Sequence, residues 1–518
     1  MKKIRRVFWL LFLSALLFLS GCGTNTKNDD GNSDEPVVLR VADGAEPVTF
    51  DIQATNDIPT VRISKQIYET LIFQTSELGL EPGLATEWEE VEENLFEFKL
   101  RENVIFHNGE KFTADDVAYT FKRAIESPAI GHIVESIDPE TIEVIDEHTI
   151  QIGTYETFGP FLTHLAHPTV AILNEKAVEE AGDEYGTDIV VGTGPFEFEE
   201  WITGTQVIAN RFEDYWGEEP EIDTIEFNII ADSSVRLIEL ESDAIDIAYD
   251  IASSDLKAVE ENDELTLINT PNLGAEYLGL SVHNDTPLRE KKVRQAIAHV
   301  IDVPSIINTV YEGVGEQMSG PISELVFGFN DELDPIEYNV DQAKDLLAEA
   351  GYPDGGFTLS LYVGDSNPQR IQVSQIISEA LAEIGIDVEI VQMEWGAFLE
   401  ATALGEPDMF LLGWITATAD ADQGLYPLFH SNNVGEAGNR SFYENDHVDE
   451  LLDQGKSTMD EDKRLEYYKE AQEIIHDEVP WVFLQTLENV TAINNRVHGF
   501  EHYPTGHYVF SPVTLDKE

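Results

Sequence analysis

The sequence predicts an α/β protein of more than one domain. Strand and helix patterns alternate along most of its 518 residues, for example in the strand 357–364, the helix 369–384 and the strand 386–393. This order implies a largely parallel sheet covered by helices. Hydrophobic residues make up 42% of the chain and aromatic residues 10%, which is enough to build a folded core. The length exceeds that of an ordinary single domain.

The first elements are a strand and a helix. Residues 37–44, VVLRVADG, are rich in β-forming residues and end in a turn. After a loop, Ile63, Ile67 and Leu71 follow one another at intervals of four, which is helical spacing. We therefore expect a helix that contains all three residues.

A hairpin and a capped helix are expected next. Apolar and polar residues alternate from Leu95 to Leu100, and Asn108-Gly109 is a tight-turn dipeptide, so the segment 95–112 is interpreted as a hairpin. Thr113 and Asp116 have the spacing of a helix cap, and an apolar face follows them.

The rest of the chain continues the alternation. Glycine stops are expected after two helices, at Gly351 and Gly385. Strands are expected within 190–201, 205–212, 222–232, 244–251, 277–282 and 479–485, and helices within 233–242, 293–301, 338–350 and 462–480.

The lone cysteine of the chain lies at a junction near the N-terminus. Basic residues are followed by an apolar run at 7–19, which is typical of a secretory signal peptide and too short for a confident membrane span. Leu19-Ser20-Gly21-Cys22 resembles the bacterial lipobox, which implies a diacylglycerol on Cys22. Residues 23–36 are polar and predict a flexible tether. An ordinary signal peptide with an incidental thiol is the alternative.

The net charge is extreme. The chain has 100 Asp and Glu against 30 Lys and Arg, a formal net charge of −70. Such a surface is repelled by nucleic acid and by anionic lipid, so phosphate-binding functions are excluded. We interpret it as an adaptation to salt, since a short Debye length screens the self-repulsion. Stability is then expected to rise with salt.

Catalytic and cofactor motifs are incomplete. GLSVH at 279–283 lacks the second glycine of a nucleophile elbow, and GTGPFE at 192–197 has Glu197 in place of the third glycine of a dinucleotide loop. DQGKST at 453–458 has no preceding strand. The histidines, including His164 and His167, form no zinc motif. We expect no enzyme, no metal and no cofactor, although a hydrolase stays open.

Four long segments carry a resemblance to a known family. They are LEPGLATEWEEVEENLFEFKLRENVIFHNGEKFTADDVAYTFKRA (80–124), GTGPFEFEEWITGTQVIANRFEDYWGEEPEIDTIEF (192–227), PLREKKVRQAIAHVIDVPSIINTVYEGVG (287–315) and YNVDQAKDLLAEAGYPDGG (338–356). The chain from Val37 onward resembles the family 5 extracellular solute-binding proteins of ABC importers. Residues 393–431 and GNRSFY at 438–443 are most similar to the branch labelled glutathione- or oligopeptide-binding.

The resemblance implies a two-lobed periplasmic-binding-protein-like fold with mixed sheets, hinge strands and an extra subdomain in the N-terminal lobe. The expected order is a signal peptide at 1–21, a lipidated Cys and tether at 22–36, lobe I at 37–56, its extra subdomain at 57–189, lobe I again at 190–276, lobe II at 277–489 and a last part of lobe I at 490–518.

The resemblance also implies a peptide site between the lobes. A peptide receptor must pair both charged ends of its ligand, because each unpaired buried polar group costs about 1–3 kcal/mol. Trp395 and Trp414 match the tryptophans that wall the family's pocket. In several peptide-binding relatives an Asp follows the glycine-tryptophan pair by three positions, and here that position is Ala417. The remaining candidates are Asp420 or Asp422 for the ammonium, Arg440 or Arg370 for the carboxylate, and Asp43, Gly44, Ala45, Glu46 and Tyr277 as other ligand contacts.

These expectations combine into one function. We expect a monomeric receptor, lipid-anchored on the extracellular face of the cell membrane in a salt-rich environment. It is expected to capture a peptide or glutathione between two closing lobes and deliver it to the permease and ATPase subunits of an ABC importer. Nickel, haem or oligosaccharide is the alternative cargo in the same family, and a surface hydrolase or chaperone is the alternative of another class.

Overall fold

The computed structural model describes residues 36–283, 285–435 and 438–516. Residues 37–518 form one compact unit. The expected signal peptide, Cys22 and most of the tether lie outside the described residues. In the part of the chain that the structure describes, no helix has both the length and the apolar character needed to cross a membrane.

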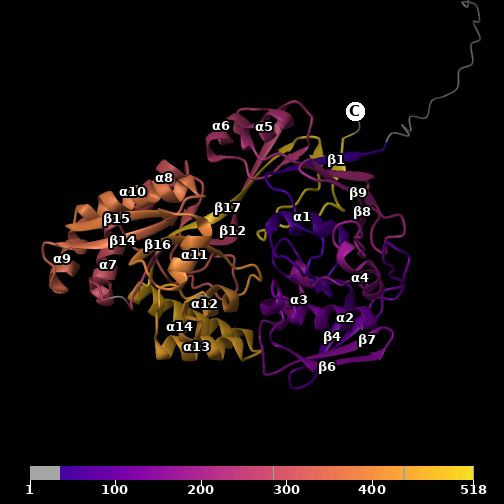
Figure 1. The fold of residues 1–518 in the computed structure, drawn as a ribbon, viewed down its shortest axis with the longest axis horizontal. Helices are drawn as coiled ribbons and strands as arrows, with labels where there is room; N and C mark the ends of the chain where they lie inside the picture. The colour runs from indigo at the N-terminus through magenta and orange to yellow at the C-terminus, as the bar shows by residue number, and fades with distance from the viewer. Residues whose placement is uncertain (1–35, 284, 436–437, 517–518) are drawn as a thin grey trace, which may run out of the picture. The chain divides into compact units, whose positions relative to one another are not determined.

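One mixed sheet runs through the unit (Figure 1). The strand order is β15-β14-β16-β12-β17-β11-β1-β10-β9-β8, with β13 added on β17. The pairing is parallel around β1 and β14 but antiparallel at β12, β16 and β17 and at the β10-β9-β8 end, so the expected largely parallel sheet is mixed. The strands are β1 (Val38–Asp43), β8 (Phe196–Ile202), β9 (Gln206–Arg211), β10 (Thr224–Ile229), β11 (Ile247–Ala248), β12 (Leu265–Leu280), β13 (Glu316–Gln317), β14 (Phe357–Gly364), β15 (Ile386–Met393), β16 (Met409–Ile415) and β17 (Trp481–Asn494).

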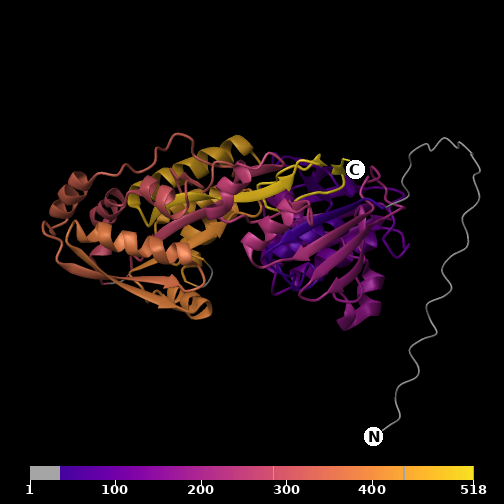
Figure 2. The same ribbon diagram turned by 90° about the horizontal axis from the view of Figure 1, so that it is seen from above.

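Two long strands, β12 and β17, cross from one lobe to the other (Figures 1 and 2). The first half of β12 pairs with the end of β17, close to β11. The second half pairs with β16 on its other side. The register of the β12–β17 pair shifts between Pro271 and Ala275, which separates these two halves of β12.

The first lobe buries a large core and a smaller one. The large core takes its residues from β1, from the segment between Phe50 and Phe227, from Ile247 and Tyr249, and from the C-terminal segment 493–513. The smaller core gathers around Leu237 and Leu240. A second sheet, of order β4-β5-β7-β6, packs against α2. The elements are α1 (Ile58–Ile67), β2 (Ile72–Gln74), β3 (Leu80–Pro82), β4 (Ala85–Glu92), β5 (Leu95–Leu100), α2 (Ala114–Ile125), β6 (Ile137–Asp146), β7 (Thr149–Thr154), α3 (Phe161–Leu165), α4 (Glu175–Ala181), α5 (Ser233–Glu241), α6 (Leu256–Glu260), β18 (Val497–His498) and β19 (Thr514–Leu515).

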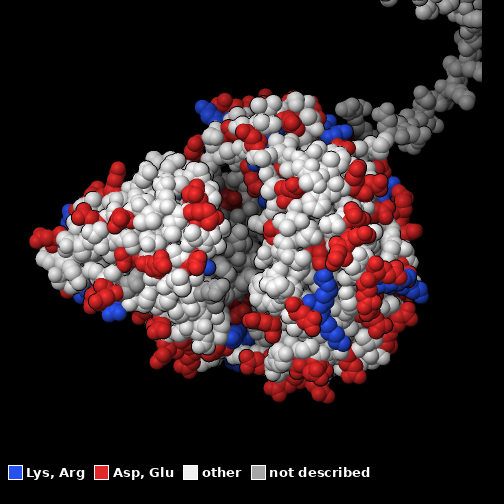
Figure 3. All heavy atoms as spheres, viewed as in Figure 1, with Lys and Arg blue, Asp and Glu red and all other residues white. Residues whose placement is uncertain are grey.

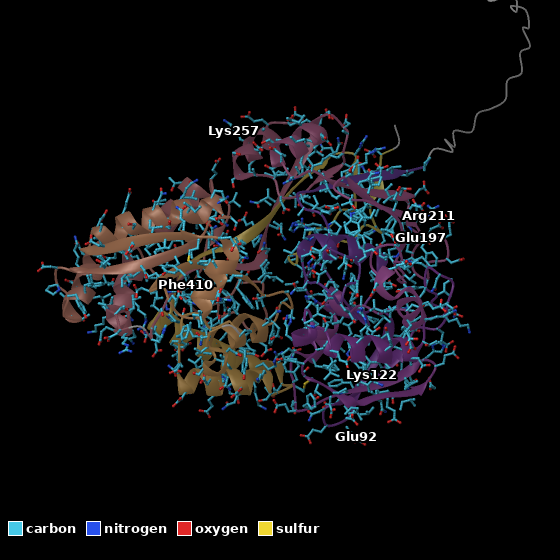
Figure 4. The ribbon with its side chains drawn as sticks, in the orientation of Figure 1. Glu92, Lys122, Glu197, Arg211, Lys257 and Phe410 are labelled. Carbon is cyan, nitrogen blue, oxygen red and sulfur yellow. The ribbon has the colours of Figure 1, made fainter. Side chains whose placement is uncertain are left out.

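The second lobe buries two cores, one on each side of β16. One core gathers around Leu359 and Leu361 of β14, and the other around Phe410 and Trp481. Phe410 is fully buried (Figure 4). The helices are α7 (Lys291–Val300), α8 (Val303–Val310), α9 (Val340–Glu349), α10 (Pro368–Ala382), α11 (Trp395–Ala403), α12 (Ala421–Phe429), α13 (Asp446–Lys456) and α14 (Glu461–Glu478).

The helix ends follow their predicted signals. At the start of α2, Thr113 and Asp116 form the expected capping box. The helices α9 and α10 are followed by Gly351 and Gly385 with φ of 94° and 78°. A left-handed φ favours glycine, which explains why these helices stop there.

Two local expectations were wrong. The helix predicted from Ile63 to Leu71 ends at Ile67, because Tyr68 is extended and the chain continues into β2. The strand at 95–100 pairs with β4 and β7 and not with the segment after Asn108-Gly109, where a single bridge joins Ile105 and Lys111 among the described residues. In both places strand pairing overrides the local pattern, because β2 forms a short hairpin with β3 and β5 pairs with the distant β7. The exact lobe boundaries stay a prediction.

Candidate functional site

A cavity of about 530 Å³ opens on the second lobe. Strand β16 and Tyr277 of the neighbouring β12 line one part of the cavity, and α10 and α11 contribute further side chains to its lining. The space-filling view shows a groove between the lobes (Figure 3). We call this cavity the lobe II pocket; its lining residues are Tyr277, Arg370, Trp395, Leu399, Leu412, Gly413, Trp414, Ile415, Leu428, Gly438, Arg440 and Leu487.

Two indole rings line the lobe II pocket. Trp414 lies on β16, and its Nε1 donates to the carbonyl of Gln423 at 3.1 Å. Trp395 begins α11, stacks on Phe398 and remains 38% exposed. Because the Trp414 N–H is used within the protein, its ring offers an apolar surface to the pocket. The two rings therefore favour contact with apolar groups of a ligand over contact with polar groups.

A buried ion pair lies against the pocket. Nε and Nη2 of Arg370 donate to the two carboxylate oxygens of Glu276 at 2.9 and 2.5 Å. A Cβ on Gly413 would lie 2.7 Å from Nη2 and 2.8 Å from Oε1, so glycine makes room for the pair. Burial lowers the pKa of Arg370, but Glu276 outweighs that effect and raises it overall. The guanidinium is therefore charged.

A second guanidinium, that of Arg440, comes from the described segment that begins at residue 438. Its Nη1 donates to the carbonyl of Leu399 at 2.5 Å and to Oγ1 of Thr402 at 2.7 Å. Both partners belong to α11. The pocket thus joins two predicted carboxylate partners with both predicted tryptophans and with Tyr277, whose ring is buried and stacks on Trp481.

The two candidate acids lie elsewhere. Asp420 is 1% exposed, accepts two hydrogen bonds from Nη2 of Arg464 at 2.7 and 2.9 Å, and caps α12 through the amide of Asp422. Asp422 is also buried, and burial raises its pKa to about 7, with a smaller contribution from Asp420. Neither side chain is among the described residues that line the pocket.

The candidate loop after β1, residues 43–46, makes its contacts within the first lobe. Asp43 pairs with Arg62 at 2.8 Å and accepts from the amide of Ala45. Glu46 accepts from Nε1 of Trp201 at 3.0 Å. Gly44 is packed so closely that a Cβ would lie 3.0 Å from Nη1 of Arg236. The loop has its own contacts and does not line the lobe II pocket.

The lobes also meet away from the crossing strands. The amide of Gly159, in the first lobe, donates to the carbonyl of Lys456, in the second, at 2.7 Å. A Cβ on Gly159 would lie 2.4 Å from the carbonyl oxygen of Thr458. Only a residue without a side chain fits this approach.

Sequence reasoning missed one functional candidate, Glu276. A charge inside the apolar strand segment GAEYLGL is unusual, because buried carboxylates require a partner. That signal was present, but it did not identify Arg370, which lies 94 residues away. Among the described residues, no group of three histidine, cysteine or acidic side chains is placed to hold a metal ion.

Comparison with known proteins now assigns the fold. The model of the bacterial extracellular solute-binding proteins, family 5 (Middle), matches residues 79–436. The chain belongs to this family. Its members bind solutes, and the two-lobed expectation is confirmed by solved structures of the same fold.

Relatives within the family have different named ligands. The glutathione-binding protein GsiB of Escherichia coli O1:K1 / APEC is 30% identical, with 92% of this chain and 94% of that protein covered. The heme-binding protein A of Haemophilus influenzae is 29% identical over 88% of this chain and 87% of its own length. The structure of DppA from Helicobacter pylori with the peptide STSA is 30% identical, with a TM-score of 0.77 and coverage of 93% and 98%.

Proposed function

We propose that this protein is the substrate-binding receptor of an ABC importer and that its cargo is a peptide, including glutathione. The observation that supports this most is the lobe II pocket, in which two tryptophans lie beside two arginines. Apolar walls with a few fixed charges suit a peptide, whose side chains vary while its termini do not. Relatives named for dipeptide and glutathione binding support the same ligand class.

The mechanism that fits this function is closure of the lobes about the crossing strands β12 and β17. The ligand shifts the population toward the closed form only if it contacts that form better than the open one. The pocket supplies one wall, and the loop 43–46 of the first lobe is a candidate for the other. The hydrogen bond from Gly159 to Lys456 joins the two lobes away from the crossing strands, so it is a candidate contact for this equilibrium.

The remaining parts of the proposal concern the surroundings of the receptor. We place it at the outer face of the membrane as a monomer, anchored by lipid on Cys22, in a salt-rich medium and in contact with permease and ATPase subunits. Two acyl chains on one residue suffice for stable attachment. Replacement of Cys22 by Ser should abolish fatty-acid labelling, and persistent labelling would exclude this anchor.

A thermal-shift panel tests the cargo. Short peptides, glutathione, haem, nickel and oligosaccharides are added separately to the purified protein in molar NaCl. We expect peptides or glutathione to raise the midpoint. Haem is the second candidate, because a heme-binding relative covers most of the chain. A shift with haem, nickel or a sugar and none with any peptide would contradict the proposal.

A further inference from the structure

The interlobe contact is formed by backbone atoms of Gly159 in the first lobe and of Lys456 and Thr458 in the second. The amide of Gly159 donates to the carbonyl of Lys456 at 2.7 Å. A Cβ on Gly159 would lie 2.4 Å from the carbonyl oxygen of Thr458, so the two backbones leave no room for water at this point. Charged groups that border the contact therefore lose hydration when the lobes meet there and regain it when they part.

One such group is the carboxyl of Asp422, in the first turn of α12. The same Cβ on Gly159 would lie 2.6 Å from Nε of Arg464, whose Nη2 donates to both oxygens of Asp420. The amide of Asp422 in turn donates to Oδ1 of Asp420 at 3.0 Å. A short series of contacts thus connects the first lobe to the start of α12.

The Asp422 carboxyl is buried and only partly satisfied. The residue is 9% exposed, and its Oδ1 has no hydrogen-bond partner within the described part of the chain. Asp420 differs, because Arg464 neutralises its charge. A buried carboxylate that lacks partners is costly when it is ionised, so this site favours the neutral acid.

Charged and titratable groups face this carboxyl from both lobes. They are Asp420 before α12, Lys456 on α13, Arg464 and Tyr468 on α14, and Glu135 in the first lobe. The two cations are already engaged, because Arg464 binds Asp420 and Lys456 lies 3.8 Å from Asp453. Neither of them therefore neutralises Asp422 completely.

The charge that the first lobe contributes has the same sign as ionised Asp422. Glu135 is exposed and follows Ile133, whose carbonyl accepts from Nδ1 of His164 at 2.7 Å. The His164 ring packs edge-on against Phe158, the neighbour of Gly159. Burial lowers the pKa of His164, so the ring adds no positive charge at neutral pH. The part of the first lobe that forms the interlobe contact thus brings a carboxylate towards Asp422.

We propose that protonation of the Asp422 carboxyl controls closure of the lobes: the neutral acid permits the interlobe contact, and the carboxylate weakens it. The inference rests on the proposed peptide function, because peptide binding is what reports closure. Loss of hydration and repulsion from Glu135 act when the lobes are together and are relieved when they separate. The closed form therefore binds this proton more tightly than the open form.

The direction of the pH effect follows from this difference. Burial, with smaller contributions from Asp420 and Glu135, raises the pKa of Asp422 to about 7 in this structure. In the open form the pKa lies closer to the ordinary value of 3.8. Closure is thus favoured fully below the pKa of the open form, and this advantage is lost as the pH rises through about 7. Peptide affinity should fall over the same range.

Peptide affinity at different pH values tests the inference. Methionyl-leucine is titrated by calorimetry into wild type and Asp422→Asn between pH 5 and pH 8, at one fixed salt concentration. We expect the affinity of wild type to fall about fivefold or more, and Asp422→Asn to keep an affinity close to that of wild type at pH 5. Both proteins receive the same peptide, so the titration of the peptide's own termini cancels in the comparison. A parallel fall in both proteins would overturn the inference.

The same titrations distinguish control of closure from direct ligand binding. If Asp422 instead contacted the ligand through its carboxylate, Asp422→Asn would bind more weakly than wild type at pH 8. That result would overturn the inference and leave the peptide function intact. If wild type bound no peptide at any pH, the proposed peptide function itself would fail. The two failures are therefore distinguishable.

A variant in the other lobe separates closure from an effect confined to the second lobe. Glu135→Gln removes an exposed carboxylate, so the protein should fold normally. Its affinity should equal that of wild type at pH 5 and exceed it about twofold or more at pH 8, because less repulsion opposes closure. A group that titrates only within the second lobe would give no such difference. Affinities equal to those of wild type at both pH values would contradict the inference.

The matched control is Glu197→Gln, the same change of charge elsewhere in the first lobe. Glu197 is on β8, on the side of the first lobe that faces away from the second (Figure 4). This variant should reproduce the pH dependence of wild type. If it raised affinity at pH 8 as much as Glu135→Gln, the effect would come from the overall charge of the protein, and the inference would be wrong.

Discussion

Two buried carboxylate–guanidinium pairs in the second lobe have the same chemistry and different surroundings. In the Asp420–Arg464 pair, the side chains are 1% and 6% exposed, and the guanidinium lies over the rings of Phe327 and Tyr468. In the Glu276–Arg370 pair, the guanidinium borders the lobe II pocket. The first pair is enclosed, and the second faces a cavity that a ligand can fill.

The difference teaches that pairing alone does not decide what a buried charge does. Arg464 uses Nε for the carbonyl of Gly455 and Nη2 for Asp420, and its guanidinium lies over packed aromatic rings, so it holds α12 against α14. Arg370 uses Nε and Nη2 for Glu276, and it lines the lobe II pocket. What each guanidinium faces, aromatic rings or a cavity, distinguishes the structural pair from the candidate binding pair.

The largest expected effect comes from breaking the enclosed pair. Arg464→Met leaves Asp420 buried without a partner, which should cost about 3–5 kcal/mol of unfolding free energy in urea. Peptide affinity of the protein that remains folded should stay within about twofold. The neighbouring Lys463→Met is the control, because its ion pair with Asp460 is exposed and should matter little. If Arg464→Met kept normal stability but lost peptide affinity, Asp420 would be a binding residue.

The next effect concerns the pocket wall. Trp414→Ala removes a large apolar surface from the ligand, so peptide affinity should fall by about 2 kcal/mol, roughly 30-fold. Stability should change less than with Arg464→Met. Calorimetric titration measures the affinity, and Trp88→Ala on β4 provides a matched loss of an indole in the other lobe. Equal affinities for the Trp414 variant and wild type would remove this ring from the site.

A pH effect belongs to the neighbourhood of the enclosed pair. Burial raises the pKa of Asp422 from its ordinary value of 3.8 to about 7, so the folded state holds the proton more tightly than the unfolded state. Stability from this group is therefore complete below about pH 4, falls as the pH rises to about 7 and is constant above it. Asp422→Asn should abolish that fall in urea titrations between pH 4 and 8. If Asp422→Asn and wild type showed the same dependence of stability on pH, Asp422 would be ionised in the folded protein over this range.

The smallest effect is expected at the contact between the lobes. Gly159→Ala places a Cβ against the carbonyl of Thr458 and opens the hydrogen bond to Lys456. The loss of one such bond is worth about 0.5–1.5 kcal/mol. Peptide affinity should fall about threefold, and the free energy of unfolding without ligand should fall by no more than this one bond is worth. If affinity stays the same, this contact takes no part in closure.

Much of the fold follows from local patterns. The order of β14, α10 and β15 was predictable because the strands alternate with a long helix that stops at Gly385. Local signals failed where strand pairing decides the outcome. The apolar spacing through Leu71 favoured a helix, yet the chain is extended at Tyr68 and Ile72–Gln74 pairs with β3.

The candidate site also combines features that the sequence could predict with features that it could not. The tryptophans at 395 and 414 were predicted together through the family resemblance, and the structure places both on one pocket. The partner of Asp420 lies 44 residues away and that of Arg370 lies 94 residues away. No periodicity connects residues at such separations, so the sequence could not choose between Asp420 and Asp422 or between Arg370 and Arg440. Their contacts in the folded chain separate them.

The most direct test of the account is a crystal structure with bound methionyl-leucine. The account predicts the leucine side chain against Trp395 and Trp414, with the terminal carboxylate within hydrogen-bond distance of Arg370 or Arg440. A peptide bound away from the lobe II pocket would contradict the account.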